Sequence, residues 1–299
     1  MGKAGLALND YLLSVLLGVI EGLTEFLPVS STAHLRIAEA ALGLDLTNGY
    51  WKMYSIVIQL GAILCLPIYF RRRIGGLVAS FPNGERGDRS FTTHPLSLTF
   101  IAFLFTAVPA FLLTKIIGKH LESLVVMGCS LLIGGIVMWL VDSVFARRPR
   151  TLRLDDMSMA QAIWIGACQT LSAVFPGTSR SMATIAAGEL AGMSREAALE
   201  FSFFLSMPTM AAATLYDLLK TLRPKQVPGA ASLAPLHVDA HGWVLLAIGF
   251  AVSFVVAYGV VAWFMRWVRS RGFVPFAIYR IVLGAAVLWW ALGAGRPLP

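Results

Sequence analysis

A small set of residues with the chemistry for phosphoryl transfer interrupts the apolar stretches of this chain. Glu21 and Glu25 are four residues apart and share one face of a helix, and Ser31 and His34 follow shortly after them. Arg180 carries a guanidinium fork that suits phosphate oxygens. A serine hydroxyl becomes a nucleophile when a neighbouring base takes its proton, and an imidazole or a carboxylate can assist. The set predicts attack on a phosphate-bearing substrate.

The segment that carries these residues occurs twice. Residues 18–32 read GVIEGLTEFLPVSST and residues 166–180 read GACQTLSAVFPGTSR, at a constant offset of 148. Residues 54–60 also resemble residues 201–207, at an offset of 147. Interrupted apolar segments at corresponding places in two halves predict a site at the interface of a repeat. The alternative is that two short resemblances arose by chance.

Each copy of the motif predicts a helix that breaks and then restarts. Pro28 and Pro176 cannot continue a helix, and the hydroxyl residues that follow them are N-cap candidates. A helix that restarts there points free N–H groups and its positive dipole end at the break, which favours a phosphate. Gly177 allows the backbone to approach a ligand closely. The other expected polar contacts are Ser30, Thr32, Thr178, Ser179, Ser181 and Thr184.

These residues also have structural interpretations. Serine and threonine inside a membrane often bond to their own backbone or to a neighbouring helix, and we leave both interpretations open for the hydroxyls. Ionisable residues at that depth are costly, which favours a functional role for Glu21, Glu25, His34 and Arg180. The competing interpretation is a structural Glu25–Arg180 ion pair. A third interpretation gives Glu21 and Glu25 to a divalent cation.

The composition is that of an integral membrane protein. The chain is 57% hydrophobic and 13% charged, and its mean hydropathy is +0.73. A soluble globular domain does not need so large a share of apolar residues. A span needs about 20 apolar residues. We expect spans near 51–69, 97–115, 123–142, 199–219, 243–265 and 275–292. The three cysteines lie in apolar runs without metal-ligand spacing, so we expect them to pack as ordinary core residues.

The net charge of +8 does not indicate nucleic acid, because the basic residues lie in loops beside spans. If the arginine-rich loops share a side, their charge makes that side cytoplasmic and leaves both termini outside. The arginines concerned are Arg71, Arg72, Arg73, Arg86, Arg89, Arg147, Arg148, Arg150, Arg153, Arg266, Arg269 and Arg271.

The two halves, residues 1–150 and 151–299, follow one plan and form one functional domain. Each half has a broken apolar hairpin followed by three spans. Because three is odd, the second half would enter the membrane upside down relative to the first. The expected fold is therefore an all-α integral membrane protein with an inverted-topology repeat.

The motifs together resemble a known family. The strings EGLTEFLPVSSTAHL and PGTSRSMAT resemble the two signatures of the undecaprenyl-pyrophosphate phosphatase family, also called the bacitracin-resistance family. The runs at 57–63 and 200–208 are similar to the same family. The resemblance implies six transmembrane helices plus two re-entrant helix pairs in the bacterial cytoplasmic membrane. It also implies hydrolysis of undecaprenyl pyrophosphate to undecaprenyl phosphate and phosphate, at a site facing the outer side.

Carried over by motif position, the resemblance assigns roles to single residues. Glu21 and Glu25 become the acidic pair, Ser31 the nucleophile, His34 the acid/base and Arg180 the phosphate-binding arginine. Magnesium or calcium would serve as the metal, with Glu21 and Glu25 as its ligands, and no organic cofactor is expected. Membrane lipid and undecaprenyl pyrophosphate are the expected partners, nucleic acid is not, and a homodimer is left open.

Two positions depart from the family pattern. Ala33 and Met182 stand where the family usually has glycine, and Met182 is bulky enough to narrow the site or to alter the fit of the lipid. Neither change removes a reactive group, so activity is expected. The rival interpretation is a secondary transporter or lipid flippase, because broken helices in an inverted repeat also suit alternating access. A purely structural membrane protein is a third interpretation.

Overall fold

The computed structural model describes residues 9–44, 49–113, 123–145, 149–222 and 238–293, and this part of the chain is helical. Six of its helices are long and apolar enough to cross a membrane, which confirms the six predicted spans and makes this a multi-pass membrane protein. They are α3 (Gly49–Tyr69), α5 (Pro95–Leu112), α7 (Leu124–Val144), α10 (Arg195–Leu222), α11 (Ala240–Arg271) and α12 (Val274–Gly293).

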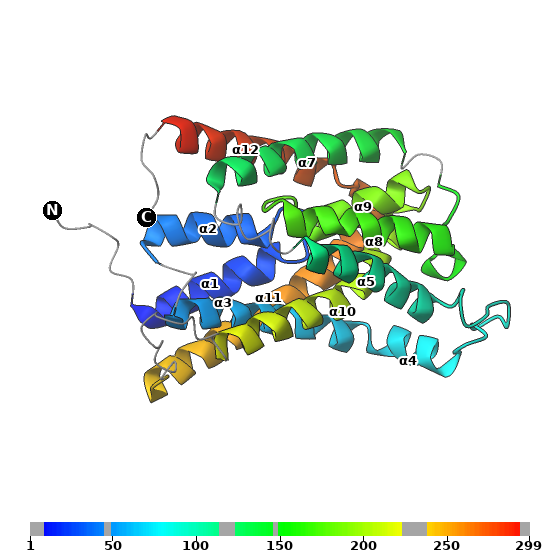
Figure 1. Cartoon of the computed structure of the whole chain (residues 1–299), viewed down its shortest axis with the longest axis horizontal. Helices are drawn as coiled ribbons and strands as arrows, with labels where there is room; N and C mark the ends of the chain where they lie inside the picture. The colour runs from blue at the N-terminus through cyan, green and yellow to red at the C-terminus, as the bar shows by residue number, and fades with distance from the viewer. Residues whose placement is uncertain (1–8, 45–48, 114–122, 146–148, 223–237, 294–299) are drawn as a thin grey trace.

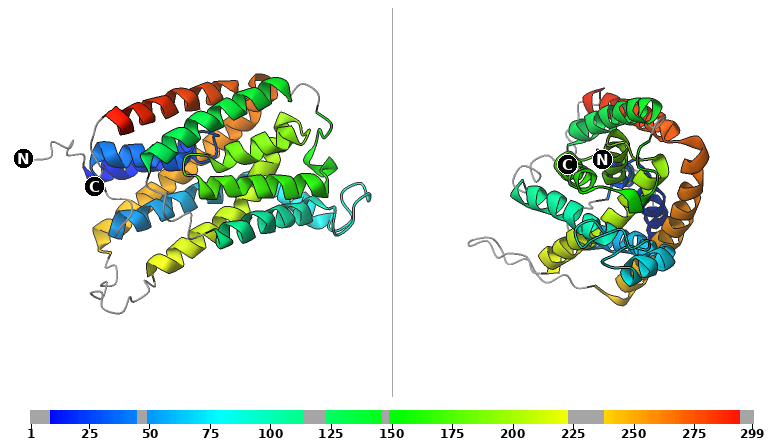
Figure 2. Two further views of the ribbon diagram at one scale, coloured as in Figure 1. Left: turned by 45° about the horizontal axis from the view of Figure 1, so that its top comes forward. Right: turned by 90° about the vertical axis from the view of Figure 1, so that its right-hand side faces the viewer.

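Four shorter helices form two hairpins inside this set of spans (Figure 1). The first hairpin is α1 (Asp10–Thr24) and α2 (Ser31–Leu42), and the second is α8 (Met159–Val174) and α9 (Arg180–Leu190). The two hairpins approach each other from opposite ends of the molecule (Figure 2). A short helix, α4 (Arg71–Ala79), lies at the end from which the second hairpin starts.

Contacts at the two ends fix these directions. At the start of the first hairpin, the Asp10 carboxylate lies 3.2 Å from the His241 ring at the start of α11. At the start of the second, the Gln161 side chain donates to the carbonyl of Ala191, which directly follows α9. The colours of Figure 1 show that α3, α7 and α11 run toward the end that carries α4, whereas α5, α10 and α12 run away from it.

The arginine-rich end is held by ion pairs between loops. Arg73 contacts Asp155 at 2.6 Å and Glu200 at 3.0 Å. Burial opposes the charge of Arg73, but the hydrogen bonds and charges of these two carboxylates outweigh it and raise its pKa. At the same end, Arg195 lies 2.5 Å from Asp142.

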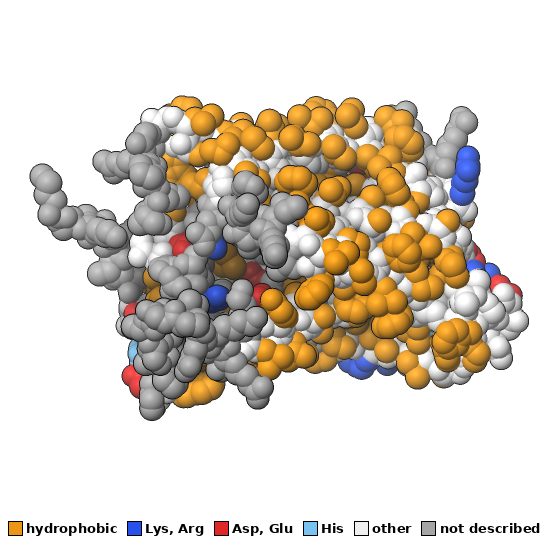
Figure 3. Space-filling model, in the orientation of Figure 1, with side chains coloured by type: hydrophobic (Ala, Val, Ile, Leu, Met, Phe, Trp, Pro, Cys, Tyr) orange, Lys and Arg blue, Asp and Glu red, His pale blue; other side chains and the backbone are white. Residues whose placement is uncertain are grey.

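Arg269, in the third arginine-rich segment, lies 2.7 Å from Glu196 near the start of α10. The described parts of the three arginine-rich loops therefore share one end, which is the condition that the orientation argument required, whereas Arg147 and Arg148 lie outside the described residues. Charged side chains are visible at that end of the molecule, while hydrophobic side chains cover much of the face between the ends (Figure 3).

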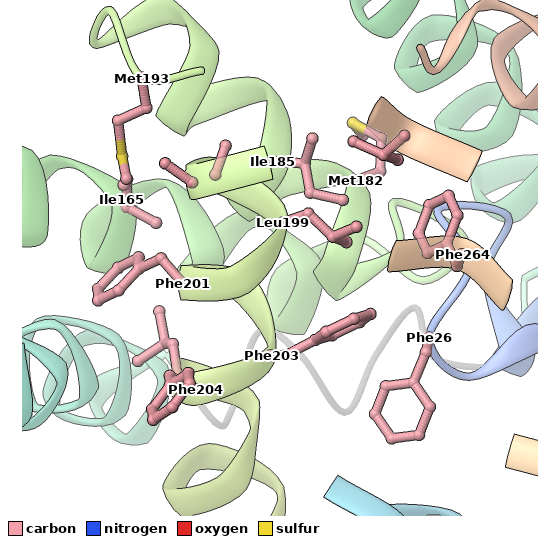
Figure 4. Close-up of a cluster of buried hydrophobic side chains, with 14 of the residues drawn as sticks. Phe26, Ile165, Met182, Ile185, Met193, Leu199, Phe201, Phe203, Phe204 and Phe264 are labelled. Atoms are coloured by element: carbon pink, nitrogen blue, oxygen red, sulfur yellow. The ribbon is translucent and has the colours of Figure 1, made fainter. Parts of the chain in front are cut away.

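Aromatic and aliphatic side chains from both halves share one buried core (Figure 4). Phe26, in the turn of the first hairpin, meets Phe203 of α10 edge-to-face, with ring centroids 5.6 Å apart. The core therefore anchors the turn of a helix hairpin directly on a membrane span.

Two glycines that match in the repeated motif make equivalent close contacts. A Cβ on Gly18 would lie 2.9 Å from the carbonyl oxygen of Gly249 in α11. A Cβ on Gly166 would overlap the backbone of Ala102 in α5. Gly249 and Ala102 are 147 positions apart, nearly the offset of the repeated motif. The close contact between α1 and α11 therefore corresponds to the close contact between α8 and α5.

We expect Gly166→Ala to destabilise the protein by about 1–3 kcal/mol, because α8 would have to move away from α5. The control is Gly259→Ala, since a Cβ there meets nothing within 4 Å. Alanine is also the better helix former, so the control should be neutral or slightly stabilising. Thermal unfolding in detergent measures both. Equal midpoints for the two variants would show that the close contact between α8 and α5 does not limit stability.

Candidate active site

The first hairpin turns between Thr24 and Ser31, where Pro28 prevents the helix from continuing. Ser30 is the N-cap of α2, and its hydroxyl accepts from the Ala33 N–H at 3.4 Å. Ser30 has φ of 74°, a left-handed conformation that is uncommon for a residue with a side chain. Such conformations cluster at functional sites, because the surrounding structure must hold them in place.

The second hairpin repeats this local structure. Gly177, with φ of 91°, supplies the turn, and its lack of a side chain matters because a Cβ would meet the backbone of Met127. Ser179 caps α9 with φ of 69° and accepts from the Met182 N–H at 3.4 Å. The two caps are therefore Ser30 and Ser179, which are 149 residues apart.

This cap pairing differs by one residue from the pairing that the sequence motif indicates. In the motif, at an offset of 148, Ser31 stands opposite Ser179. In the structure, Ser31 and Arg180 are the equivalent first residues of α2 and α9. The physical reason is that α1 ends two motif positions earlier than α8, while the first turn, from Glu25 to Ser30, is only one residue longer than the second, from Phe175 to Ser179. Helix α2 therefore restarts one motif position earlier than α9.

The two turns meet inside the protein. Arg180 lies 3.5 Å from Glu25, so the ion pair that the sequence offered as an alternative is present. The Ser181 hydroxyl donates to the carbonyl of Leu27 at 2.9 Å. The Arg180 guanidinium also lies 5.9 Å from the centroid of the Phe26 ring. These contacts bring the N-termini of α2 and α9, with their free N–H groups, to one place.

Ser31 and Glu25 form a hydrogen-bonded pair at the meeting point of the two turns. The Ser31 hydroxyl donates to Glu25 Oε2 at 2.5 Å, while the other oxygen of Glu25 faces Arg180. The Glu25 side chain is 5% exposed and the Arg180 side chain 12%, whereas Ser31 is only half-buried. A carboxylate within hydrogen-bond reach of a hydroxyl can accept its proton, and the guanidinium beside it can hold an anion.

Glu21 completes the acidic pair. It is buried one helical turn before Glu25, and within the described residues neither of its carboxyl oxygens has a hydrogen-bond donor. The unpartnered oxygens of Glu21, beside the Glu25 carboxylate, fit a divalent cation that takes its other ligands from water and from substrate phosphates. The part of the chain that is described holds no group of three or more His, Cys, Asp or Glu side chains that could bind a metal by itself.

His34 does not contact Ser31 in this structure. Its Nδ1 donates to the Ser30 carbonyl at 2.7 Å, and its Nε2 accepts from the Tyr279 hydroxyl at 2.6 Å. The two rings are stacked, with centroids 5.7 Å apart. The hypothesis that His34 takes the proton of Ser31 therefore does not match this geometry, because both ring nitrogens are bonded elsewhere and Glu25 occupies the position of the base.

The remaining predicted residues fall into two groups. Thr32, Thr178 and Ser179 are exposed or half-buried at the helix N-termini, where a ligand can reach them. Ser181 and Thr184 are each 1% exposed. Thr184 bonds to the Ser202 hydroxyl at 2.7 Å, as the structural interpretation of intramembrane hydroxyls predicts.

The two departures from the family pattern are both buried in packing contacts. Ala33 is fully buried in a small cluster with Met127, Leu131 and Val287. Met182 belongs to the main core and fills the space beside Gly134 of α7. Met182 therefore packs against α7, and the expectation that its bulk narrows the site does not fit this position.

Arg280 contacts both hairpin turns and was not predicted from the sequence. It is fully buried in α12 and donates to four backbone carbonyls: those of Pro28, Ser130, Gly177 and Thr178, at 3.0–3.2 Å. Three of these carbonyls belong to the two hairpin turns. The sequence contains a signal for it, because burying an arginine inside an apolar span costs free energy and such a residue therefore indicates a role. Within the described residues no carboxylate pairs with it, so its charge adds to the positive potential around the turns.

We expect Arg280→Met to cost on the order of 3 kcal/mol or more, since it leaves several buried carbonyls without donors. Arg280→Lys should fall in between, because one ammonium cannot reach all four carbonyls. Arg153→Met, at a side chain that is 58% exposed, is the control and should stay within about 0.5 kcal/mol of the parent. Thermal unfolding in detergent gives all three values, and a stable Arg280→Met protein would contradict the tethering role.

Comparisons with known proteins show the family of this chain. The family described as "Bacitracin resistance protein BacA" matches residues 14–286. A protein of Koribacter versatilis (strain Ellin345) named "Undecaprenyl-diphosphatase" is 71% identical over 285 residues, covering 95% of this chain and 99% of the relative. Relatives with the same name from Sorangium cellulosum (strain So ce56) and Caldanaerobacter subterraneus are 44% and 38% identical. Each covers 92% of this chain, and the matches span 85% and 93% of the relatives.

Proposed function

Because this chain belongs to the bacitracin resistance protein BacA family, we propose that the Ser31–Glu25–Arg180 arrangement is the catalytic centre of an undecaprenyl-diphosphatase. The protein is a membrane-embedded hydrolase that converts undecaprenyl diphosphate to undecaprenyl phosphate and inorganic phosphate. The reaction fits a role in recycling the lipid carrier for cell-wall polymers. It also fits bacitracin resistance, since the antibiotic traps the diphosphate form.

The observation that carries the mechanism is the hydrogen bond from Ser31 to Glu25 beside the guanidinium of Arg180. In the first step, Glu25 accepts the Ser31 proton as Oγ bonds to the terminal phosphorus. The bond from that phosphorus to the bridging oxygen breaks, and undecaprenyl phosphate leaves with the electron pair. Phosphoryl transfer depends mainly on alignment and charge stabilisation, and the site supplies both.

The second step restores the enzyme. After the proton on Glu25 has left with the lipid phosphate, Glu25 takes a proton from water while the water oxygen bonds to the phosphorus. The serine oxygen then leaves and recovers that proton, and inorganic phosphate is released. The half-buried position of Ser31 admits the water that this step requires.

Positive groups face the phosphates from two helices. Arg180 offers its guanidinium, and Nη1 of that group has no hydrogen-bond partner among the residues that the structure describes. The N-termini of α2 and α9 add N–H groups, and Arg280 lies behind both turns. Donors that are fixed before the substrate arrives stabilise the developing charge without reorganisation.

His34 has a positioning role in this scheme. Its bond to the Ser30 carbonyl lies across the first turn of α2, and its bond to Tyr279 ties that turn to α12. The imidazole thereby holds the N-cap region that presents Ser31.

A divalent cation fits the unpartnered oxygens of Glu21, with Glu25 beside it. When bound, magnesium or calcium would neutralise phosphate charge next to the acidic pair. Without such neutralisation, two carboxylates would repel an incoming diphosphate.

We also propose an inverted repeat and a cytoplasmic-membrane orientation. The opposite directions of matched spans and the matched glycine contacts support the repeat of residues 1–150 and 151–299. The arginine-rich end would face the cytoplasm by the positive-inside rule. The first hairpin starts from the opposite end, so the site would open to the outer side. The homodimer stays a prediction.

The catalytic proposal predicts that Ser31→Ala and Arg180→Ala each lower kcat by about 10³-fold or more, by losing the nucleophile and the phosphate clamp. Ser55→Ala is the control, because its hydroxyl bonds only to the Lys52 carbonyl in α3. Phosphate release from undecaprenyl diphosphate in detergent measures the effect. Acid quenching of the parent enzyme should trap phosphoserine at residue 31.

Substantial turnover by Ser31→Ala, without a trapped phosphoserine in the parent, would favour direct attack by water. Lipid movement in vesicles without any phosphate release would instead favour the flippase.

The cation proposal predicts that chelation with EDTA lowers activity and that Mg²⁺ or Ca²⁺ restores it. Glu21→Gln should raise the Mg²⁺ concentration for half-maximal activity by about tenfold or more, because one charged ligand is lost. Glu39→Gln, outside the hairpin turns, is the matched control. Full activity of the parent protein in EDTA would remove the cation from the scheme.

A further inference from the structure

An apolar groove lies against the outside of the first hairpin. Ile20, Leu23, Thr24 and Leu27 recur at the spacing of one helix face and form one wall. The opposite wall comes from the end of α11 and the start of α12, and the cavity volume is about 500 Å³. The residues from these two spans are Trp263, Trp267, Pro275, Phe276 and Tyr279.

The chemistry of the lining favours an apolar ligand. The Thr24 hydroxyl is bonded to the carbonyl of Ile20 at 2.7 Å, and the Trp267 indole N–H donates to the carbonyl of Gly272 at 3.1 Å. His34 and Tyr279 bond to each other. Leu23, Trp263 and Tyr279 are 44–46% exposed, so the groove opens to the surroundings of the spans. A volume of this size suits part of a chain-like apolar molecule.

The groove is continuous with the reactive hairpin. Leu27 and Val29, on either side of Pro28, line it, and His34 is one helical turn after Ser31. The His34–Tyr279 pair therefore stands between the polar site and the apolar groove. An occupant of the groove would have one end within reach of Ser31.

The direction of the groove also fits a lipid whose head lies at the hairpin turns. The first hairpin starts from the end that carries Asp10 and His241, and its turn lies inside the protein. Trp263 and Trp267 are near the end of α11, where the chain reaches Arg269 and Arg271. The groove thus extends beyond the turn, toward the arginine-rich end.

We propose that this groove binds the first isoprene units of the polyprenyl chain of the substrate and directs the rest into the bilayer. This inference rests on the proposed function. The indole and phenyl rings supply broad apolar contact for a branched, unsaturated chain. The His34–Tyr279 pair marks the boundary at which the diphosphate ends and the hydrocarbon begins.

A photoreactive substrate analogue tests the placement in the parent protein. The probe is a polyprenyl diphosphate with a diazirine on its second isoprene unit, used in nanodiscs of phosphatidylglycerol. Cross-links at Leu23, Trp263, Trp267 or Phe276 are expected. Cross-links confined to α3, α5 or α10 would overturn the groove assignment. So would groove labelling by a diazirine phosphatidylglycerol that excess polyprenyl diphosphate does not displace, since the occupant would then be ordinary lipid.

Turnover by the same preparation separates the two proposals. Failure to release phosphate from undecaprenyl diphosphate would contradict the proposed function. Turnover together with cross-links outside the groove would contradict only the assignment of the groove as the binding site of the polyprenyl chain.

A matched pair of variants provides a second test. Leu23→Trp fills the groove, whereas Leu171→Trp changes the matching residue of the other hairpin, which is 50% exposed and lies outside the groove. Leu23→Trp should raise KM for undecaprenyl diphosphate by about tenfold, since the chain loses apolar contact area. The two tryptophan variants should share one thermal unfolding midpoint, which shows that the first hairpin is intact. Equal KM values for the two tryptophan variants would overturn the proposal.

Discussion

A helix that is broken inside a membrane must find partners for the backbone groups that its interrupted hydrogen-bond ladder leaves free. This structure meets that constraint twice and at one place. Arg280 donates to carbonyls of both hairpin turns, while Ser30 and Ser179 cap the helices that restart. The same breaks leave free N–H groups for an anion. The same two turns therefore hold the backbone groups that Arg280 and the caps stabilise and the N–H groups of the proposed phosphate site.

Two carboxyl groups lie close to two guanidinium groups around the hairpin turns. These are Glu21 and Glu25 on one side and Arg180 and Arg280 on the other, and only Glu25 and Arg180 form a direct ion pair. The proposed cation beside Glu21 would offset the charge that a diphosphate head brings. The hydrogen bond from Ser31 adds a demand, because the same carboxylate that steadies Arg180 must also receive a proton.

The sequence predicts much of this arrangement because its strongest signals are local. Runs of apolar residues predict the six spans, and proline followed by hydroxyl residues predicts the two breaks. The meeting of Glu25 with Arg180 follows from the repeat. The partner of His34 does not, because Tyr279 lies 245 residues away and no local pattern couples them. The cap pairing is not readable from the motif either, since α1 ends earlier in the motif than α8 and the restart of α2 shifts Ser31 to the position of Arg180. Arg280 was readable from its apolar surroundings, but its contacts with both turns were not.

The different restart positions of α2 and α9 give the two hairpins different residues at the same place in the structure. Ser31 and Arg180 occupy equivalent first positions of α2 and α9, yet the proposed mechanism makes one the nucleophile and the other the phosphate-binding cation. A protein assembled from two identical copies of either hairpin would hold two serines or two arginines there, never the complementary set. The proposed chemistry therefore requires the two hairpins to differ. Each chain would accordingly hold a single reaction centre, and a tight inhibitor should titrate it one to one.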